Sequence, residues 1–536
     1  MTKTIYLTTP LYYVNASPHI GHSYTQVAAD ALARYHRLAG REVFLLTGTD
    51  EHGQKIAQAA AAAGKPPQAF VDEVGERFKS LWKMLDIAYD DFIRTTEPRH
   101  VQAVQQILTR LKDAGKLARA EYQGWYCTPD ETFWTEAELV THGISTSAPV
   151  CPTCQRALEP AKEEGWYLRL RANQEWLRAF VAAHPDFVRP QTRYHELLGL
   201  LEQPLPEYLC ITRPKSRVTW GIAVPFAPEH VVYVWFDALL NYITAPGYVD
   251  DPVRFARLWP AEVHLIGKDI LRHHALYWPI MLHELGMTDA QMPRIFAHGW
   301  WRIGEQKMSK SLGNIVDPAA VVGGLLHGQP FAADAYRYFL LREISFGQDG
   351  SFSEVAILKR LNMDLGNDVG NLVHRTLSMT ERYFAGQLAF QPIGHLDAIS
   401  GARAMADGAV ALHASYVQRM ESLDFSGALE AVMALATQAN QFIEASAPWK
   451  LAKQPEARAQ LTQVFAVLGD VLKTLSVYLT PFMPLVGAAI WAQLGLPGRP
   501  ERLSDAAWST AAGERRIAAE HPVLFPRMDM EKLEHV

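Results

Sequence analysis

Cysteine is scarce in this sequence: four occur among 536 residues, at Cys127, Cys151, Cys154 and Cys210. So few thiols in so long a chain do not form a disulfide framework, which argues against a disulfide-stabilised secreted protein. The first residues, MTKTIYLTTPLYY, are strand-like and lack the charged and apolar regions of a signal peptide. We therefore expect a cytoplasmic location.

Long uninterrupted hydrophobic runs are also missing. The most apolar late segment, 475–496, is broken by Pro481, Pro484 and Gly487, so we expect a buried helical pair and no membrane partner. The formal net charge of −6 argues neither for nor against nucleic-acid binding, because a local basic surface is enough to attract RNA. No Walker-type GxxxxGK[ST] phosphate loop occurs.

What is present is an alternation of strand-like and helix-like segments. The expected strands are 4–9, 43–47, 231–236, 263–266 and 295–298, with a helix over 23–38. Such alternation predicts a parallel sheet with crossover helices, as in a Rossmann-like α/β domain. The stretch between the two groups of strands holds all four cysteines and is predicted as an insertion that splits this domain.

The C-terminal part has a different texture. Beyond about residue 354, runs rich in Ala, Leu, Gln and Glu have helical spacing, as in 402–420 and 428–446, which predicts an all-α bundle. The expected divisions are a first catalytic half at 1–116, an insertion at 117–225, a second catalytic half at 226–299, a loop region at 300–353 and the helical domain at 354–536.

The segment Ser17-Pro18-His19-Ile20-Gly21-His22 follows a strand and opens a helix. Ser17 is a favourable N-cap and Pro18 suits the first helical position, so two imidazoles are expected where N–H groups and the helix dipole attract anions. Gly21 has no side chain, so a flat base could lie against the backbone. Alone, the segment would equally fit two surface histidines on a capped helix.

A second string, Lys307-Met308-Ser309-Lys310-Ser311, lies far downstream between Gly304 and Gly313. Two lysines and two hydroxyls on a glycine-flanked loop suit a triphosphate whose charge shifts during reaction. Alone, this string fits an exposed basic loop better than a phosphate-binding one.

Together and in this order, the two strings resemble the HIGH and KMSKS signatures of class I aminoacyl-tRNA synthetases. The blocks PLYYVN from Pro10, TGTDEHG from Thr47, VWFD from Val234 and GKD from Gly267 resemble those of methionyl-tRNA synthetases. This resemblance implies that methionine and ATP form methionyl-adenylate and pyrophosphate, with Mg²⁺ as the ion. It also implies that methionine is then transferred to the 3′ end of initiator and elongator tRNA(Met).

The resemblance further implies roles for individual residues. The ATP-binding residues would be His19, Gly21, His22, Gly267, Asp269, Lys307 and Lys310, and His19, His22, Lys307 and Lys310 would also be catalytic. The methionine-binding residues would be Leu11, Tyr13, Asp50, Trp235, Leu239, Tyr242, His273 and His274. Aromatic walls contact a thioether favourably, and the carboxylate of Asp50 would pair with the ammonium group.

Two positions depart from the family pattern. The family commonly has an aromatic residue before the histidine that follows GKDI, whereas this chain has His273-His274, which would make the pocket more polar and pH-sensitive. The family also has an arginine before the second half, and either Arg213 or Arg217 matches it.

The insertion is predicted to hold one structural Zn²⁺ in a knuckle. Cys151 and Cys154 have the two-residue gap of a zinc turn, and Cys127 is a third thiolate. The family often has a second cysteine three residues after the first, where this chain has Asp130, so Asp130 completes the expected set. A metal-free knuckle is the alternative.

The helical bundle is predicted to bind the anticodon, because Pro448-Trp449 and the run 370–375 resemble the family's anticodon-reading blocks. Trp449 would stack on an unpaired base. Asn371 and Arg375 lie four residues apart on one helical face and could hydrogen-bond base edges.

Two rival functions stay open on the sequence. Another class I synthetase is one. The insertion is too short for the editing domain of the isoleucine, valine and leucine enzymes. The cysteine enzymes hold zinc in the amino-acid pocket, whereas the cysteines of this chain lie in the insertion. A tRNA-binding protein without catalysis is the other, and the intact HIGH and KMSKS strings argue against it. A monomer is expected, because dimeric members carry a further C-terminal domain and nine residues follow Arg527.

Overall fold

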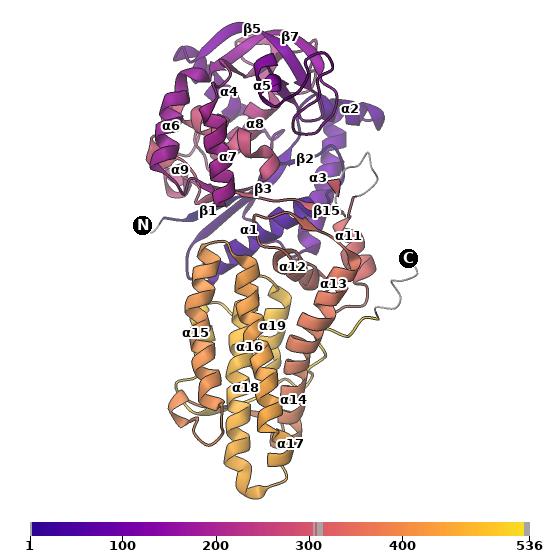
Figure 1. Cartoon of the computed structure of the whole chain (residues 1–536), viewed down its shortest axis with the longest axis vertical. Helices are drawn as coiled ribbons and strands as arrows, with labels where there is room; N and C mark the ends of the chain where they lie inside the picture. Colours follow the sequence, from indigo (N-terminus) through magenta and orange to yellow (C-terminus); the bar gives the residue numbers. More distant parts are fainter. Residues whose placement is uncertain (1–2, 304–305, 308–314, 530–536) are drawn as a thin grey trace. The chain divides into compact units, whose positions relative to one another are not determined.

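The structure, a computed structural model, describes residues 3–303, 306–307 and 315–529 (Figure 1). It divides into two compact units. The first comprises Met1–Pro18, Val43–Ser80 and Ala88–His298, and the second comprises His19–Glu42, Leu81–Ile87 and Gly299–Val536.

A seven-stranded sheet forms the centre of the first unit. Its strands are β1 (Ile5–Thr8), β2 (Tyr12–Tyr13), β3 (Val43–Asp50), β4 (Asp91–Arg94), β8 (Val188–Arg189), β13 (Val263–Gly267) and β14 (Ile295–His298). Their order is β2-β3-β1-β13-β14-β8, β4 also pairs with β3, and every pair is parallel. Parallel strands are covered on both faces, which explains why Leu45, Leu46 and Ile266 are fully buried. The predicted Rossmann-like architecture is confirmed.

The register of this sheet collects functional side chains at one edge. Leu7 of β1 lies opposite both Leu45 of β3 and Val263 of β13, so the carboxyl ends of these three strands meet. Parallel α/β sheets bind ligands at that edge. Asp50 and Gly267 are the last residues of β3 and β13, and both therefore lie there.

The strand predicted at 231–236 is wrong in its second half. β12 (Ala227–Val232) ends early and pairs antiparallel with β10 (Thr212–Pro214) and β11 (Ala223–Val224), outside the parallel sheet. The remaining residues begin α8 (Val234–Thr244). Short apolar runs do not distinguish a buried strand from a buried helix, and ten of the eleven residues of α8 are buried.

The insertion is built on an antiparallel sheet of order β6-β5-β7-β9. Its strands are β5 (Leu117–Cys127), β6 (Thr132–Trp134), β7 (Glu159–Arg169) and β9 (Tyr208–Cys210). β5 and β7 are paired from Leu117 opposite Leu168 to Tyr126 opposite Glu159. β8 also lies within the range expected for the insertion, yet it pairs with β14 of the parallel sheet.

Helices connect these strands. Those wholly in the first unit are α2 (Gln54–Ala62), α4 (Pro98–Asp113), α5 (Glu136–Thr141), α6 (Gln174–Ala183), α7 (Gln191–Glu202), α8, α9 (Pro252–Leu258) and α10 (Trp278–Glu284). α3 (Pro67–Met84) ends in the second unit. α4 packs against α8, which fixes the helix that carries several predicted methionine-binding residues.

The second unit contains the predicted helical bundle. Its principal helices are α1 (Ile20–Leu38), α12 (Ala332–Arg342), α13 (Glu354–Arg360), α14 (Asn371–Phe384), α15 (Ala402–Glu421), α16 (Phe425–Ser446), α17 (Pro448–Leu451), α18 (Arg458–Leu479) and α19 (Pro484–Gln493). Its short strands are β15 (Trp301–Ile303), β16 (Gln306–Lys307), β17 (Gly350–Ser351), β18 (Gln387–Phe390) and β19 (Gly513–Arg516). α14, α15, α16 and α18 run alongside one another (Figure 1).

The core of this bundle is α18. From Val464 to Leu479 every residue of this helix is buried, because α14, α15, α16 and α19 all contact it. Among the described residues, the segment Pro455–Leu479 is long and apolar enough to cross a membrane, but 94% of its most apolar window is buried inside the structure. Such burial is typical of a core helix.

One charged side chain lies at the centre of the second unit. Arg337 of α12 is completely buried and donates to Asp30 Oδ2 at 2.7 Å. It also donates to the carbonyl oxygens of Leu85, Pro481 and Phe482 at 2.8–3.0 Å. A buried guanidinium is tolerated when its donors are satisfied in this way.

We expect Arg337→Ala to lower the free energy of unfolding of the second unit by about 3–5 kcal/mol, because it leaves three buried carbonyl oxygens without this donor and removes one of the two arginines that pair with Asp30. Arg419→Ala is the matched control, since Arg419 is 40% exposed and pairs with Asp424 at 2.6 Å. That change should cost less than about 1 kcal/mol. Urea denaturation followed by circular dichroism measures both variants, and equal losses would contradict the expectation.

Candidate functional site

Aromatic rings from two segments form a cluster in the first unit. On α8, Trp235, Leu239 and Tyr242 are spaced four and three residues apart, so they share one helical face. The Trp235 ring stacks on His273 with centroids 3.7 Å apart and planes 15° apart. The Tyr242 hydroxyl lies 2.8 Å from His274 Nε2. The structure thus brings α8 and the segment 273–277 together, as the predicted methionine pocket requires.

The other predicted wall comes from the strand end. Tyr13 of β2 is paired with Asp50 of β3, and it packs against the same apolar cluster as Trp235, built on Tyr233 and Val234. Leu11 packs against the buried core that includes Leu239 and Tyr242. All eight predicted methionine-binding residues therefore lie in this unit, on four segments: residues 11–13, the end of β3, α8 and residues 273–274.

His273 is the unusual member of this group. It is 7% exposed, and neither ring nitrogen has a hydrogen-bond partner among the described residues. Burial and the neighbouring Arg272 hold its pKa well below the ordinary value for histidine. Burial also lowers the pKa of His274 to about 4. Both rings are therefore neutral near pH 7, and the pH sensitivity that the sequence indicated for His273 is not expected near neutrality.

Asp50 ends β3 as a buried acid with an unused acceptor. It is 8% exposed, and its Oδ1 has no hydrogen-bond partner within the described part of the chain. Burial raises the pKa of Asp50 well above its usual range, and the nearby carboxylates of Asp237 and Glu131 raise it further. A cation placed beside Asp50 would relieve this penalty, which is what an amino-acid ammonium group supplies.

A buried hydrogen-bond network that the sequence did not predict lies beside Asp50. The carboxylate of Asp237 on α8 lies 2.7 Å from His52 Nδ1 and 2.7 Å from His100 Nε2, and His100 Nδ1 lies 2.7 Å from Thr244 Oγ1. Burial alone would raise the pKa of Asp237, but His52 and His100 reverse this and hold it below the usual value. The TGTDEHG and VWFD strings contain two of these residues, which was the available signal.

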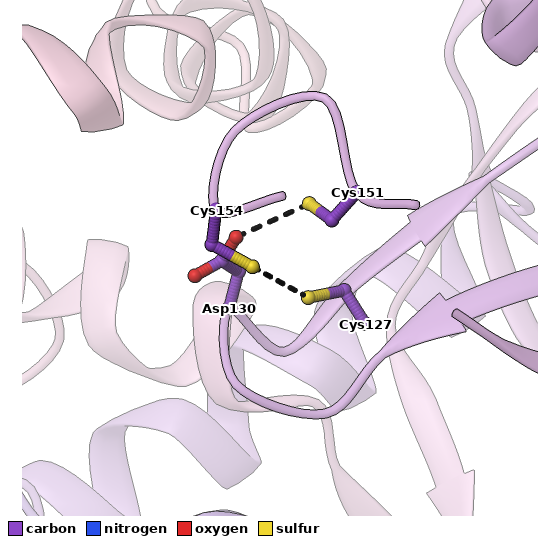
Figure 2. Close-up of side chains that lie close together, drawn as sticks. All are labelled: Cys127, Asp130, Cys151 and Cys154. Atoms are coloured by element: carbon purple, nitrogen blue, oxygen red, sulfur yellow. Dashed lines mark hydrogen bonds between the residues drawn. The ribbon is translucent and has the colours of Figure 1, made fainter. Parts of the chain in front are cut away.

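The predicted knuckle residues converge (Figure 2). The ligand atoms of Cys127, Asp130, Cys151 and Cys154 all lie within 4.8 Å of one another. Cys127 Sγ is 3.5 Å from Cys154 Sγ, and Cys151 Sγ is 3.2 Å from Asp130 Oδ2. Three sulfurs and one carboxylate are a donor set that suits zinc.

The start of α1, in the second unit, differs in detail from the prediction. The N-cap is His19 rather than Ser17, because His19 has the extended backbone of a cap and its Nδ1 accepts from Gly21 N at 3.1 Å. His22 Nδ1 accepts in return from His19 N at 3.0 Å. Ser17 instead accepts from Arg77 at 2.8 Å. The two imidazoles form a capping box with ring centroids 3.9 Å apart.

Gly21 leaves space for the His19 ring. A Cβ atom at position 21 would lie 3.0 Å from the His19 ring, tighter than most contacts of this kind. In the first unit, a Cβ atom at position 267 would lie 2.6 Å from Asp269 Oδ1, the end of an exposed side chain that can move aside. Lys307 is described only by its backbone in β16, and Lys310 lies outside the described residues.

Burial distinguishes Arg213 from Arg217, the two arginines that could match the family's position. Arg213 is buried, donates to both oxygens of Glu163 at 2.7 Å and lies over the Tyr126 ring at 4.2 Å. Arg217 is exposed in the following turn. Arg213 is therefore the arginine whose guanidinium faces the interior of the first unit.

The predicted anticodon residues lie together in the second unit. Trp449 is half-buried in α17, and Arg375 of α14 lies over its ring at 5.9 Å. Arg375 also pairs with Glu444 at 2.7 Å. Asn371 is exposed one turn before Arg375. Trp449 is thus no core aromatic, and it forms one surface with Arg375.

Comparisons with known proteins agree with this geometry. Residues 5–377 match the family model of class I tRNA synthetases (M), and residues 409–531 match the anticodon-binding domain of tRNA ligases. The chain is 43% identical over 534 residues to the methionine–tRNA ligase of Caldanaerobacter subterraneus, which covers 99% of this chain and 80% of the relative. It is 42% identical over 532 residues to that of Clostridium acetobutylicum, with coverages of 99% and 79%.

Solved structures give the same result. The Mycobacterium tuberculosis methionyl-tRNA synthetase in complex with methionyl-adenylate has a TM-score of 0.90 and 36% identity, covering 98% of this chain and 100% of that chain. The apo form of the synthetase from that organism has a TM-score of 0.83 and 33% identity, covering 99% of each chain. This chain therefore belongs to the methionyl-tRNA synthetase family, the methionine–tRNA ligases among class I tRNA synthetases.

Proposed function

We propose that this protein activates L-methionine with ATP to form methionyl-adenylate and pyrophosphate, and then transfers methionine to the 3′ end of tRNA(Met). The observation that carries this proposal is a buried acid, Asp50, whose unused oxygen lies at the strand edge beside the aromatic group of Tyr13 and Trp235. The chain that builds this pocket matches methionine–tRNA ligases over 99% of its length.

ATP–pyrophosphate exchange screened over all twenty amino acids tests this function. Methionine should give the fastest exchange, with homocysteine and norleucine as weak competitors, because apolar pockets separate near-isosteres by only about 1–3 kcal/mol. Faster exchange with another standard amino acid would overturn the assignment. No exchange with any amino acid would favour the rival, a tRNA-binding protein without catalysis.

Asp50 is proposed to bind the ammonium group, with Leu11, Tyr13, Trp235, Leu239, Tyr242, His273 and His274 around the side chain. For ATP, the proposed residues are His19, Gly21, His22, Gly267, Asp269, Lys307 and Lys310, with Mg²⁺ as the accompanying ion. His19, His22, Lys307 and Lys310 would act on the transition state by charge stabilisation, since attack of a carboxylate on the α-phosphate needs no protein nucleophile.

Methionine binding should depend on pH through Asp50. The ammonium group binds the ionised carboxylate, and the pKa of Asp50 is raised in the free pocket. The Kd for methionine should therefore increase as the pH falls through that raised pKa, and it should level off above it. Asp50→Asn should raise the Kd at least ~30-fold, from a loss of about 2–5 kcal/mol, and should remove this pH dependence.

Isothermal titration calorimetry without ATP measures these constants. Asp269→Asn is the matched control, since Asp269 is an exposed acid proposed to bind the ATP ribose. It should leave the methionine Kd unchanged and raise the KM for ATP. A methionine Kd that keeps its pH dependence in Asp50→Asn would remove Asp50 from the ammonium site.

One structural Zn²⁺ is proposed in the knuckle, held by Cys127, Asp130, Cys151 and Cys154. When bound, the ion cross-links two loops of the insertion. Protein purified without chelator should contain one zinc per chain, and Asp130→Ala should lower that content, because a ligand is lost. Cys210→Ser should leave it at one, since Cys210 lies outside the cluster. Atomic absorption measures both, and zinc-free wild-type protein would show a metal-free knuckle.

The bundle is proposed to read the CAU anticodon through Trp449, Asn371 and Arg375. Trp449→Ala should weaken tRNA charging about 5- to 150-fold, the loss of about 1–3 kcal/mol of stacking. Methionine activation should stay nearly unchanged, because Trp449 lies in the bundle, whereas Asp50 and Trp235 lie in the first unit.

Trp449→Phe is the control, because it keeps an aromatic face and should retain most of the charging activity. Charging and pyrophosphate exchange are compared for each variant. A Trp449→Ala protein that loses both activities equally would show that the indole only holds the fold together.

A cytoplasmic location and a monomeric state remain predictions. All four cysteines are free thiols, which supports a reducing compartment. Light scattering at low concentration tests the monomer.

A further inference from the structure

The loop that carries the knuckle ligand Asp130 also touches the methionine pocket. Glu131, the next residue, has a φ of 49°, a left-handed conformation that non-glycine residues rarely adopt, and is 4% exposed. Such strain persists only where the surroundings determine the conformation, and it is frequent at functional sites. Here the Glu131 side chain contacts Tyr13 of β2, whereas the side chain of its neighbour Asp130 lies in the knuckle.

The Glu131 carboxylate holds one wall of the pocket. Its Oε1 accepts a hydrogen bond from the Tyr13 hydroxyl at 2.8 Å and another from Lys55 N at 2.8 Å. Its Oε2 accepts from the Tyr126 hydroxyl at 3.2 Å. Lys55 adds to the same contact, because its Nζ donates to Pro129 O at 3.0 Å and lies 5.4 Å from the Tyr13 ring centroid.

The chain leaves room for this pair. Gly53 has a φ of 108°, and a Cβ atom there would lie 2.6 Å from Glu131 Oε1 and 2.7 Å from the Tyr13 hydroxyl oxygen. Any larger residue at position 53 would therefore displace the hydrogen bond between Glu131 and Tyr13.

The loop also holds the opposite wall. Asp130 O accepts from Trp235 Nε1 at 3.2 Å, and Glu131 O accepts from the Tyr233 hydroxyl, just before α8. A third contact comes from α5 of the insertion, where Glu138 pairs with Arg272, the neighbour of His273. Three of the four segments that form the pocket are thus attached to the insertion, and two of them to residues 130–131.

We propose that Glu131 is a positioning residue for methionine binding, which fixes Tyr13 and couples the state of the Cys127/Asp130/Cys151/Cys154 knuckle to the amino-acid pocket. The inference rests on the proposed function. Glu131 touches no substrate in this scheme and acts through Tyr13. Loss of the knuckle ion would release residue 130 and, with it, the backbone that aims the Glu131 side chain.

A double-mutant cycle on methionine binding tests this inference. Glu131→Ala and Tyr13→Phe should each raise the methionine Kd about tenfold. The Kd of the double variant should be no higher than the higher Kd of the two single variants, because both changes remove the same hydrogen bond between Tyr13 and Glu131. Glu131→Gln should restore most of the affinity, since its amide oxygen still accepts from Tyr13. Tyr126→Phe is the matched control, because it removes another hydrogen bond to the same carboxylate and should leave the Kd unchanged.

The coupling to the knuckle has its own measurement. Chelation of the metal from wild-type protein should raise the methionine Kd, and in Glu131→Ala the same treatment should change it little. Additive effects of Glu131→Ala and Tyr13→Phe, or a loss in Tyr126→Phe equal to that in Glu131→Ala, would show a structural role only and overturn the inference. Thermal melting of each variant accompanies the titrations.

The two proposals fail separately. If the wild-type protein catalyses methionine-dependent ATP–pyrophosphate exchange and the Glu131→Ala variant has an unchanged methionine Kd, only the role of Glu131 is overturned. Wild-type protein that does not activate methionine overturns the proposed function itself.

Discussion

The carboxylate of Asp237 holds together three segments that are far apart in the sequence. It accepts from His52, which follows β3, and from His100 of α4, while it sits on α8. An ionised carboxylate that is completely buried is tolerable only when both oxygens have donors. Because α8 also carries Trp235 and Tyr242, this buried acid sets the position of the aromatic wall relative to Asp50. The geometry of the pocket therefore depends on a residue that lines no part of the predicted ligand site.

The parallel sheet supplies the second constraint on the site. Strands β1, β3 and β13 end at one edge, so residues separated by more than 200 positions, such as Asp50 and Gly267, lie at the same level. The insertion then contributes from outside the sheet, through Glu131 and Glu138. The pocket is therefore formed by the edge of the parallel sheet together with the loop at residues 130–131 of the insertion.

Local pattern predicted a good part of this arrangement. The strands at 4–9, 43–47, 263–266 and 295–298 and the helices at 402–420 and 428–446 are confirmed within a few residues, since each has a periodicity of its own. The knuckle residues were found because cysteine spacing is specific, and their convergence agrees with it.

What the sequence could not predict depends on tertiary contacts. The run 231–236 is apolar in both its strand and its helical half, so periodicity does not reveal where α8 begins. Ser17 is a good cap by residue type, but Arg77 takes its hydroxyl and leaves His19 as the cap. The two histidines that bond Asp237 are 137 and 185 positions away, Tyr13 is 118 positions from Glu131, and no local pattern reports such distances.

The histidine capping box of α1 links the orientation of the two proposed ATP-binding histidines to the stability of the first helical turn. His19 and His22 are oriented by hydrogen bonds that exist only while the first turn of the helix is formed. First turns commonly fray in local opening events far below the free energy of global unfolding. Here such fraying would break the hydrogen bonds that both imidazoles make with the backbone of that turn. The backbone hydrogen bond from Ile20 N to Val316 O ties that turn to a distant part of the chain and therefore opposes its opening.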